Sequence, residues 1–283
     1  MNDFNSYEDA KRAEAYARLE FPGTYYLAYR DLPEIIGKYV VGDDGESGGG
    51  TGDGIIGKGG ESGGGTGDGI MGDGGESGGG TGNKALDFGC GTGRSTRFLQ
   101  KLGFDTIGVD ISDDMLKLAR ETDPAGKYLK VADGVFDALE NNRFDLVLSS
   151  FTFDNIPTFD KKVKNFKEIA RVLKNDGSII SIVSSPEIYT HEWASFSTKY
   201  YPENKNARCG DTVKIIITAI EDSRPVEDIV WPDADYQDVY YESGLVEVEK
   251  REPPAVGDEP YEWINETTIA PWVIYVLKKK DTV

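Results

Sequence analysis

From Lys84 onward, the chain alternates short apolar segments with amphipathic helical ones. Phe144–Leu148 is almost continuously apolar, as is typical of a strand that is buried on both faces of a sheet. This alternation of strands and helices predicts a parallel, doubly wound α/β sheet. The expected strands are Lys84–Phe88, Thr106–Val109, Tyr128–Val131, Phe144–Leu148, Ser178–Val183, Val213–Ile220, Leu245–Glu249 and Trp272–Leu277. The expected helices are Ser95–Leu102, Asp113–Arg120, Lys161–Leu173 and Asp233–Glu242.

A glycine-rich window precedes this alternation. It holds 22 of the 35 glycines, between Gly42 and Gly82, and the string GESGGGTGDGI occurs at 45–55 and again at 60–70. Such a composition buries too little apolar surface to offset the entropy of ordering it. We therefore expect residues 42–83 to be a disordered insertion. A calcium-binding repeat is the alternative, although the run at 49–53 is one residue short of that pattern and the repeat period is wrong.

Residues 1–41, ahead of the insertion, are expected to form a helical segment that packs on the main domain. Ser6 to Leu19 is rich in alanine, with Ser6 as its cap. Thr24 to Tyr39 is a second helical stretch, which Pro33 bends or breaks. Because the insertion lies directly before the first parallel strand, we expect it to emerge at the amino ends of the strands.

The formal net charge of −19 restricts the partners that we expect. Binding to nucleic-acid phosphates depends on clustered lysines and arginines, and this acidic chain has no basic stripe. We therefore expect neither a nucleic-acid partner nor a membrane surface as partner. No apolar run approaches the ~20 residues of a spanning helix, and the polar start is unlike a signal peptide. The two cysteines, Cys90 and Cys209, imply neither a metal site nor a disulfide, so we expect a cytoplasmic protein.

A glycine motif lies between the first expected strand of the sheet and its helix. It reads Leu86-Asp87-Phe88-Gly89-Cys90-Gly91-Thr92-Gly93. Alternate glycines let a backbone turn sharply and approach a ligand, beside the free N–H groups of a helix N-terminus. A dinucleotide-binding fingerprint would read G-x-G-x-x-G and place phosphates there. Here the pattern is G-x-G-x-G after an acid, and a carboxylate at that strand end suits a cationic ligand better than a pyrophosphate.

The glycine motif resembles motif I of the class I, Rossmann-like S-adenosylmethionine-dependent methyltransferases, and further features follow in the family's order. Asp110 ends the second strand, 17 residues after Gly93, where the family keeps an acid for the ribose hydroxyls. Ala132-Asp133-Gly134 follows the third strand, where the family places an acidic or polar residue near the adenine amino group. The segment at 144–150 resembles the family's fourth-strand motif. The turn at 173–178 resembles its LKPGG turn, with Asn175-Asp176 in place of Pro-Gly.

The resemblance covers roughly Lys84 to Val183 and implies a fold, a cofactor and a reaction. The fold is a mostly parallel seven-stranded sheet with helices on both faces, ending in an antiparallel strand. The cofactor is S-adenosylmethionine, and the reaction is in-line methyl transfer for which the protein supplies binding, orientation and exclusion of water. We expect a small-molecule acceptor with an O-, N- or C-nucleophile, held in the domain 84–283 beneath a cap formed by residues 186–232. The alternative is a non-catalytic or regulatory cofactor-binding protein that uses the glycine-rich segment as a tether.

The resemblance also implies a set of cofactor-binding residues. They are Asp87, Gly89, Cys90, Gly91, Gly93, Asp110, Ile111, Asp133, Gly134 and Ser149. Each acid has a structural alternative: Asp87 caps the glycine loop, Asp110 is a turn acid, and Asp133 belongs to an Asp-Gly turn. Cys90 is either a small residue in a tight loop or a reactive thiol.

His191, the only histidine, is the candidate general base. It lies just past the fifth strand of the sheet, and ligands of open α/β sheets bind beyond the carboxyl ends of the strands. An imidazole accepts a proton near neutral pH. A surface or packing role is the alternative, and Glu187, Tyr189 and Asp154 are rival candidates for the base.

The stretch before the insertion is rich in tyrosine, and N-terminal helices of the similar family often close over the cofactor. Tyr25 or Tyr29 would then stack on the cofactor or contact its sulfonium through a cation–π interaction. The alternative is an aromatic helix face that packs on the sheet without touching a ligand. The sequence leaves both interpretations open.

Overall fold

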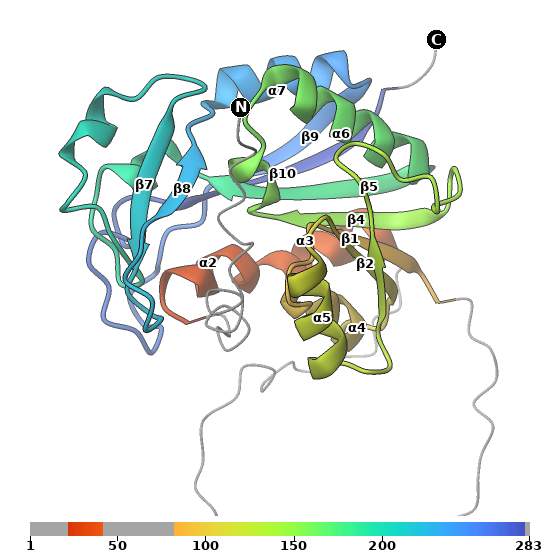
Figure 1. The fold of residues 1–283 in the computed structure, drawn as a ribbon, viewed down its shortest axis with the longest axis horizontal. Helices are drawn as coiled ribbons and strands as arrows, with labels where there is room; N and C mark the ends of the chain where they lie inside the picture. Colours follow the sequence, from red (N-terminus) through yellow and green to blue (C-terminus); the bar gives the residue numbers. More distant parts are fainter. Residues whose placement is uncertain (1–21, 42–81, 281–283) are drawn as a thin grey trace, which may run out of the picture.

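The structure is a computed structural model that describes residues 22–41 and 82–280 (Figure 1). Within these ranges the main sheet consists of β1 Lys84–Phe88, β2 Asp105–Asp110, β3 Lys127–Lys130, β4 Phe144–Ser150, β5 Leu173–Ser184, β9 Leu245–Arg251 and β10 Trp272–Lys279. The helices are α2 Thr24–Arg30, α3 Leu32–Ile36, α4 Arg94–Lys101, α5 Asp113–Thr122, α6 Phe159–Val172 and α7 Asp233–Glu242. Shorter helical turns are η1 Gly37–Val41, η2 Thr152–Asn155, η3 Pro186–Tyr189 and η4 Pro202–Asn206.

The main sheet has the strand order β3-β2-β1-β4-β5-β10-β9. Neighbouring strands from β3 to β5 are parallel, and β10 runs antiparallel to both β5 and β9. The doubly wound sheet with an antiparallel last strand is therefore confirmed. In such a sheet the carboxyl ends of β1, β2 and β4 lie at one edge, where they can assemble a ligand site.

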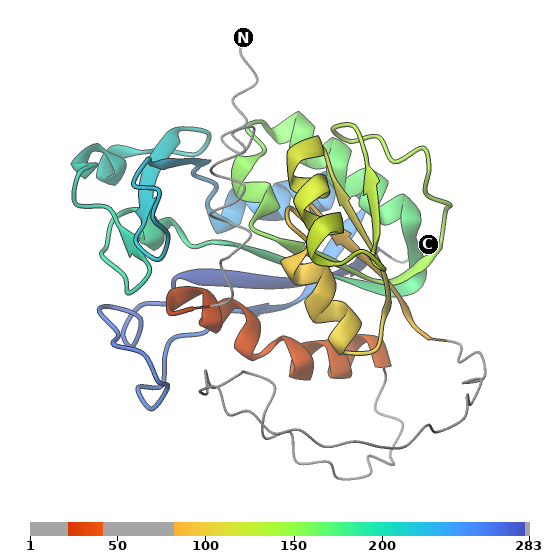
Figure 2. The same ribbon diagram turned by 60° about the horizontal axis from the view of Figure 1, so that its bottom comes forward.

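The two faces of the sheet bury separate hydrophobic cores. Successive side chains of a strand point to opposite faces, so Leu146 and Leu148 of β4 join the core against α2 and α3, whereas Val147 joins the core against α6 and α7. Figure 2 shows α2 and α3 along one face of the sheet, with α6 and α7 on the other. No helix within the described ranges has the length and apolar character needed to cross a membrane.

The helical stretch before the insertion is interrupted at Asp31, between α2 and α3. Pro33 lies in the first turn of α3, where its missing N–H leaves no hydrogen bond unmade. The prediction of an interrupted helix is confirmed, but its position at Pro33 is wrong, because the break lies at Asp31 and Pro33 belongs to α3. The expected helix Ser6–Leu19 and the glycine-rich repeat lie outside the described residues.

The described residues that flank the insertion lie at the amino edge of the sheet. The carbonyl of Tyr39 accepts a hydrogen bond of 3.1 Å from Ser178 Oγ of β5, and Ser178 pairs with Leu146 in the first half of β4. The Lys84 amide, at the start of β1, donates to Asp145 Oδ2 over 2.8 Å. Both flanks are thus remote from the carboxyl edge, as the chain order predicts.

A second, smaller sheet lies within residues 186–232. It has the order β6-β7-β8 and consists of β6 Phe196–Ser197, β7 Thr212–Ile217 and β8 Val226–Ile229, all antiparallel. Figure 1 shows β7 and β8 beside the main sheet. The sequence predicted only the strand that became β7, because β6 and β8 are too short to show a period of their own.

The buried carboxylate of Glu266 joins three segments that are distant in sequence. Its Oε1 accepts hydrogen bonds of 2.7 Å from Thr24 Oγ1 in α2 and from the Ala194 amide. Its Oε2 accepts from the Ile264 and Asn265 amides in the loop before β10. This carboxylate therefore fixes α2 against residues 186–232 at the carboxyl edge.

Candidate active site

The glycine loop, residues 89–93, connects β1 to α4 at the carboxyl edge. Gly89, Gly91 and Gly93 have φ angles of 71°, 52° and 81°, in the left-handed region that favours glycine. A methyl group on Gly89 would lie 2.1 Å from Thr152 Oγ1, whereas one on Gly91 would meet no described atom within 4 Å. Gly89 thus permits close packing on η2, and Gly91 leaves an open cradle that a ligand can fill.

Asp110 lies at the end of β2 and holds the glycine loop by its backbone. Its Oδ2 accepts a hydrogen bond of 2.8 Å from the Gly91 amide, and its Oδ1 accepts one of 2.9 Å from the Ser112 amide. Burial raises the pKa of this carboxyl. Asp110 therefore stabilises the glycine loop and the turn after β2 by these two hydrogen bonds. Ribose binding is compatible with them, because each carboxylate oxygen can accept a second hydrogen bond. Ile111 follows with 49% of its surface exposed, unusual for a large apolar residue.

Asp87 is fully buried in β1, beneath the glycine loop. Its Oδ2 accepts hydrogen bonds from Ser95 Oγ (2.7 Å) and Thr96 Oγ1 (2.6 Å) of α4. Its Oδ1 is buried and has no hydrogen-bond partner among the described residues. Burial raises the pKa of Asp87 to about 6, although the two hydroxyl donors oppose the shift. An unpartnered buried oxygen is uncommon in folded proteins and fits a donor supplied by a ligand.

Four more predicted residues occupy distinct environments. Cys90 is buried, and burial raises the pKa of its thiol well above the ordinary value, which favours the small-residue interpretation. The Asp133 carboxylate faces α6, where it accepts a hydrogen bond of 2.8 Å from Asn165 Nδ2, and the Gly134 amide donates to the same side chain. Ser149, in β4, is buried, and its Oγ has no partner among the described residues. The cofactor roles of Asp133, Gly134 and Ser149 stay predictions.

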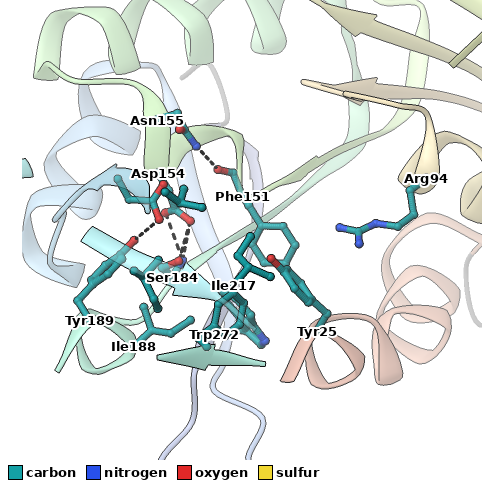
Figure 3. Close-up of a pocket in the computed structure, with 14 residues that line it drawn as sticks. Tyr25, Arg94, Phe151, Asp154, Asn155, Ser184, Ile188, Tyr189, Ile217 and Trp272 are labelled. Atoms are coloured by element: carbon teal, nitrogen blue, oxygen red, sulfur yellow. Dashed lines mark hydrogen bonds between the residues drawn. The ribbon is translucent and has the colours of Figure 1, made fainter. Parts of the chain in front are cut away.

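A cavity of about 70 Å³ lies at the carboxyl edge, between the main sheet and residues 186–232 (Figure 3). Aromatic rings from α2, the end of β4, η3, β6 and β10 line it, together with aliphatic side chains from η3, β7 and β8. Two acids and one guanidinium make up the charged lining. The aromatic residues are Tyr25, Phe151, Tyr189, Phe196 and Trp272, and the charged residues are Asp154, Asp228 and Arg94.

Phe151 shapes this cavity by an unusual backbone conformation. Its φ of 64° and ψ of 0° put a bulky side chain in the left-handed region, which costs about 1 kcal/mol. The Phe151 amide donates to the Ile182 carbonyl over 2.8 Å, which holds the turn in place. The turn redirects the chain from β4 into η2, so that Asp154 reaches the cavity while the Phe151 ring packs on Trp272.

Asp154 is buried at the cavity end that lies away from Arg94 (Figure 3). Its carboxylate accepts hydrogen bonds from the Ser184 amide (3.1 and 3.2 Å) and from Ser184 Oγ (2.8 Å). Burial raises the pKa of Asp154. Nearby, the Tyr189 hydroxyl donates to Asp228 Oδ2 over 3.2 Å. Carboxylates and their hydroxyl donors therefore form one polar end of an otherwise apolar cavity.

Lys162 of α6 lies behind this polar end and is fully buried. Its ammonium donates to the Phe153 carbonyl and lies 4.8 Å and 5.3 Å from the ring centroids of Trp231 and Tyr236. Burial lowers the pKa of Lys162, while the charge of Asp154 opposes that shift. Lys162 is not among the described residues that line the cavity.

His191 is likewise not among the described residues that line the cavity. Its Nδ1 lies 3.0 Å from Thr190 Oγ1 and 3.3 Å from Glu187 Oε2, beyond η3. Its rivals Asp154 and Tyr189 do line the cavity. The sequence placed all these residues past strand ends but gave no sign of which side chains the connections turn inward. It also missed Arg94, whose one sequence signal was its position directly after the glycine motif.

Tyr25 and Tyr29 confirm the interpretation of an aromatic helix face packed on the sheet. Tyr25 stacks on Trp272 with ring centroids 5.7 Å apart and also packs against Phe196 at 4.9 Å. Tyr29 packs edge-on against Phe98 at 5.3 Å. Tyr25 additionally borders the cavity. Its contact with a sulfonium stays a prediction.

Residues 86–181 match a family described as a methyltransferase domain. The chain carries a class I methyltransferase domain. The domain is similar to tocopherol O-methyltransferase of Arabidopsis thaliana, with 34% identity over 105 residues that cover 35% of this chain and 29% of that one. It is also 32% identical over 122 residues to malonyl-[acyl-carrier protein] O-methyltransferase of Buchnera aphidicola. These residues cover 42% of this chain and 48% of that one. The matches thus span less than half the length of these two relatives.

The fold of the methyltransferase domain also occurs in solved structures. An S-adenosylmethionine-dependent methyltransferase from Methanosarcina mazei superposes with a TM-score of 0.52 and 14% identity, over 71% of this chain and 94% of that one. The cofactor of the family is S-adenosylmethionine, and the glycine loop fits it. The open cradle at Gly91, the unpartnered Asp87 Oδ1 and the exposed Ile111 offer it space, a polar contact and an apolar contact.

Proposed function

We propose that this chain is an S-adenosylmethionine-dependent methyltransferase that acts on a small-molecule acceptor. The observation that carries the proposal is the direct contact between the glycine loop and the wall of the cavity. η2, which brings Asp154 to the cavity, packs against Gly89, and Thr152 Oγ1 donates to the Phe88 carbonyl over 3.0 Å. A methyl group held at the loop is therefore adjacent to an acceptor held in the cavity.

The cofactor supplies an electrophilic methyl group, and the residues of this chain hold and orient the reactants. In this proposal Asp87, the glycine loop, Asp110 and Ile111 hold the cofactor, with Asp133, Gly134 and Ser149 as further contacts. Residues 186–232 form the cap, because β7 and β8 supply the aliphatic wall of the cavity. We do not assign the base role to His191, because its ring contacts Glu187 and Thr190 instead.

Other properties of the chain agree with a small-molecule acceptor. The cavity is lined mostly by apolar and aromatic side chains with a few polar groups, as is typical of small-molecule sites. One relative, tocopherol O-methyltransferase of Arabidopsis thaliana, is named for a small-molecule acceptor. The acidic composition supports the absence of a nucleic-acid partner. Both cysteines are free thiols, which supports a reducing, cytoplasmic setting.

The test is calorimetric titration of the full chain with S-adenosylmethionine and S-adenosylhomocysteine. We expect micromolar binding that Asp110→Ala weakens by tenfold or more, which is about 1.4 kcal/mol. Gly91→Ala fills the open cradle with a methyl group and should weaken binding similarly, at a cost of about 1 kcal/mol in stability. The matched control is Asp113→Ala, an exposed acid three positions after Asp110, which should change affinity less than twofold.

Absence of binding by folded wild-type protein would refute the proposed function. Equal losses in Asp110→Ala and Asp113→Ala would show a general charge effect and contradict the site. Binding without any methylated product, after incubation with candidate acceptors and mass spectrometry, would favour the non-catalytic alternative. Detection of a methylated small molecule would confirm the activity.

A further inference from the structure

We infer that the acceptor is an amine and that its nitrogen receives the methyl group. This inference rests on the proposed function and specifies its substrate class. It is drawn from the charges that line the cavity and from the direction in which charge moves during transfer. A neutral hydroxyl and an anionic oxygen are the competing nucleophiles.

The polar end of the cavity is built to receive a cation. Asp154 and Asp228 are both buried there, and a carboxylate accepts hydrogen bonds from an ammonium group. The rings of Phe151 and Trp272, whose centroids lie 4.6 Å apart, form the adjoining wall. Aromatic faces attract cations and also bury an apolar body. Carboxylates beside aromatic rings therefore fit an acceptor with an apolar body and an amino head group.

The transfer itself moves positive charge toward the acceptor. The amine nitrogen forms a bond to the methyl carbon, the carbon–sulfur bond breaks with its electron pair left on sulfur, and the positive charge passes from sulfur to nitrogen. An amine that is protonated in solution gives its extra proton to water before the transfer, so that both carboxylates keep their charge and the product leaves as a methylated ammonium ion. Carboxylates near the nitrogen stabilise the charge as it develops, so they contribute more in the transition state than in the ground state.

An oxygen nucleophile is disfavoured by the same groups. A hydroxyl that gives its proton to Asp154 becomes an anion that still faces the charge of Asp228, and like charges at short distance raise the cost of ionisation. An acceptor carboxylate would meet the same repulsion. The cavity therefore discriminates against anionic oxygen at the position where it favours a cationic nitrogen.

The two basic residues near the cavity do not reverse this conclusion. Arg94 lies on the glycine-loop side, 5.2 Å from the Tyr25 ring, with Phe151 and Tyr25 between it and Asp154 in Figure 3. Lys162 lies behind the lining, with its ammonium against the Phe153 carbonyl and the Trp231 and Tyr236 rings. Its charge offsets part of that of Asp154 and Asp228, which leaves one net negative charge at the polar end. The polar groups that an acceptor meets there are the two carboxylates, Tyr189, Ser184 and Asn155, whose amide group donates to the Phe151 carbonyl.

The experiment compares three probes of similar shape: 2-phenylethylamine, 2-phenylethanol and phenylacetate. Each is titrated calorimetrically into the full wild-type chain saturated with S-adenosylhomocysteine at pH 7.5. We expect the amine to bind at least tenfold more tightly than the alcohol, and phenylacetate to bind more weakly than the alcohol. Equal or tighter binding of the alcohol, or no detectable binding of the amine at millimolar concentration, would overturn the inference.

A matched pair of variants tests the carboxylate directly. Asp154→Asn keeps an oxygen that accepts from Ser184 but removes the charge, so amine affinity should fall at least tenfold while alcohol affinity changes less than threefold. Asp160→Asn removes an exposed charge from the first turn of α6 and should leave both affinities unchanged. Equal amine affinity in Asp154→Asn and wild type contradicts the inference. If Asp154→Asn does not fold, the ranking of probes on wild type decides alone.

The identity of the methylated product tests the amine inference separately from the proposed methyltransferase function. Incubation with S-adenosylmethionine and the amine should yield N-methyl-2-phenylethylamine by mass spectrometry. Binding of S-adenosylhomocysteine together with methylation of the alcohol alone would overturn the amine inference and leave the proposed function intact. A folded chain that binds neither form of the cofactor refutes the proposed function itself.

Discussion

Replacing the buried Asp87 with asparagine should stabilise the methyltransferase domain at neutral pH and leave it little changed at pH 4. The ordinary aspartate pKa of 3.8 rises to about 6 in the folded protein, because burial penalises the charged form. One pKa unit corresponds to 1.36 kcal/mol, so ionising Asp87 costs about 3 kcal/mol more in the folded state than in the unfolded state. Asparagine still accepts from Ser95 and Thr96 through its oxygen and carries no charge.

The sign of the pH dependence follows from proton binding. The folded state keeps the Asp87 proton to a higher pH than the unfolded state does. The contribution of Asp87 to the free energy of unfolding is therefore fully present below pH 3.8. It is lost as pH rises through about 6. Wild type should therefore lose about 2–3 kcal/mol relative to Asp87→Asn between pH 4 and pH 7.5. Other groups that titrate in this window, such as Asp154, are common to both proteins and cancel in the difference.

The assay is urea unfolding of both proteins at pH 4.0 and pH 7.5, with free energies extrapolated to water. Asp113→Asn, which neutralises an exposed acid, serves as the control for the removal of one carboxylate. The reasoning is refuted if the difference between wild type and Asp87→Asn is the same at both values of pH. Asp87→Asn should also weaken S-adenosylmethionine binding, because an amide nitrogen replaces the unpartnered carboxylate oxygen.

Two other perturbations test how the site is supported. Glu266→Ala leaves the buried Thr24 hydroxyl and the Ala194 amide without their acceptor, at ~1–3 kcal/mol for each donor, so urea unfolding should show a loss of at least about 2 kcal/mol. The exposed Glu262→Ala is its control, and a loss below 1 kcal/mol in Glu266→Ala would contradict the buried network. Replacing Gly42–Gly82 with a short glycine–serine linker should change S-adenosylmethionine affinity less than about threefold in calorimetry, because both flanks lie at the amino edge. A folded deletion variant that fails to bind would contradict that placement.

Much of the main sheet is encoded locally and was predictable. The bounds of β1 and α7 agree with the sequence prediction to the residue, because apolar runs and turn residues mark them within a few positions. The glycine loop and Asp110 were predictable for a similar reason. Their spacing in one βαβ unit places them at the same edge of a parallel sheet. Ser112 has a residue type that favours the N-cap position, and in α5 its Oγ accepts from the Met115 amide over 3.3 Å.

The acceptor end of the site was not predictable in the same way. Asp154 reaches the cavity because Phe151 adopts a left-handed conformation, which no local propensity of phenylalanine favours. Asp228 arrives from β8, a strand of four residues with no periodic signal. His191 had the residue type expected of a base, yet the turn after η3 directs its ring toward Glu187. Residue type and chain position could not decide which side chains face inward.

The sequence by itself determined the parallel sheet, the order of its connections and the glycine loop at its carboxyl edge. Each of these depends on hydrophobic periodicity or on residues close together in one motif. Only the tertiary structure decided the acceptor cavity, which brings together α2, η2, β8 and β10. Such contacts join residues that are distant in the sequence, and they form where packing of the whole domain minimises exposed apolar surface. The charge at its polar end, and with it the preference for an amine, therefore exists only in the folded chain.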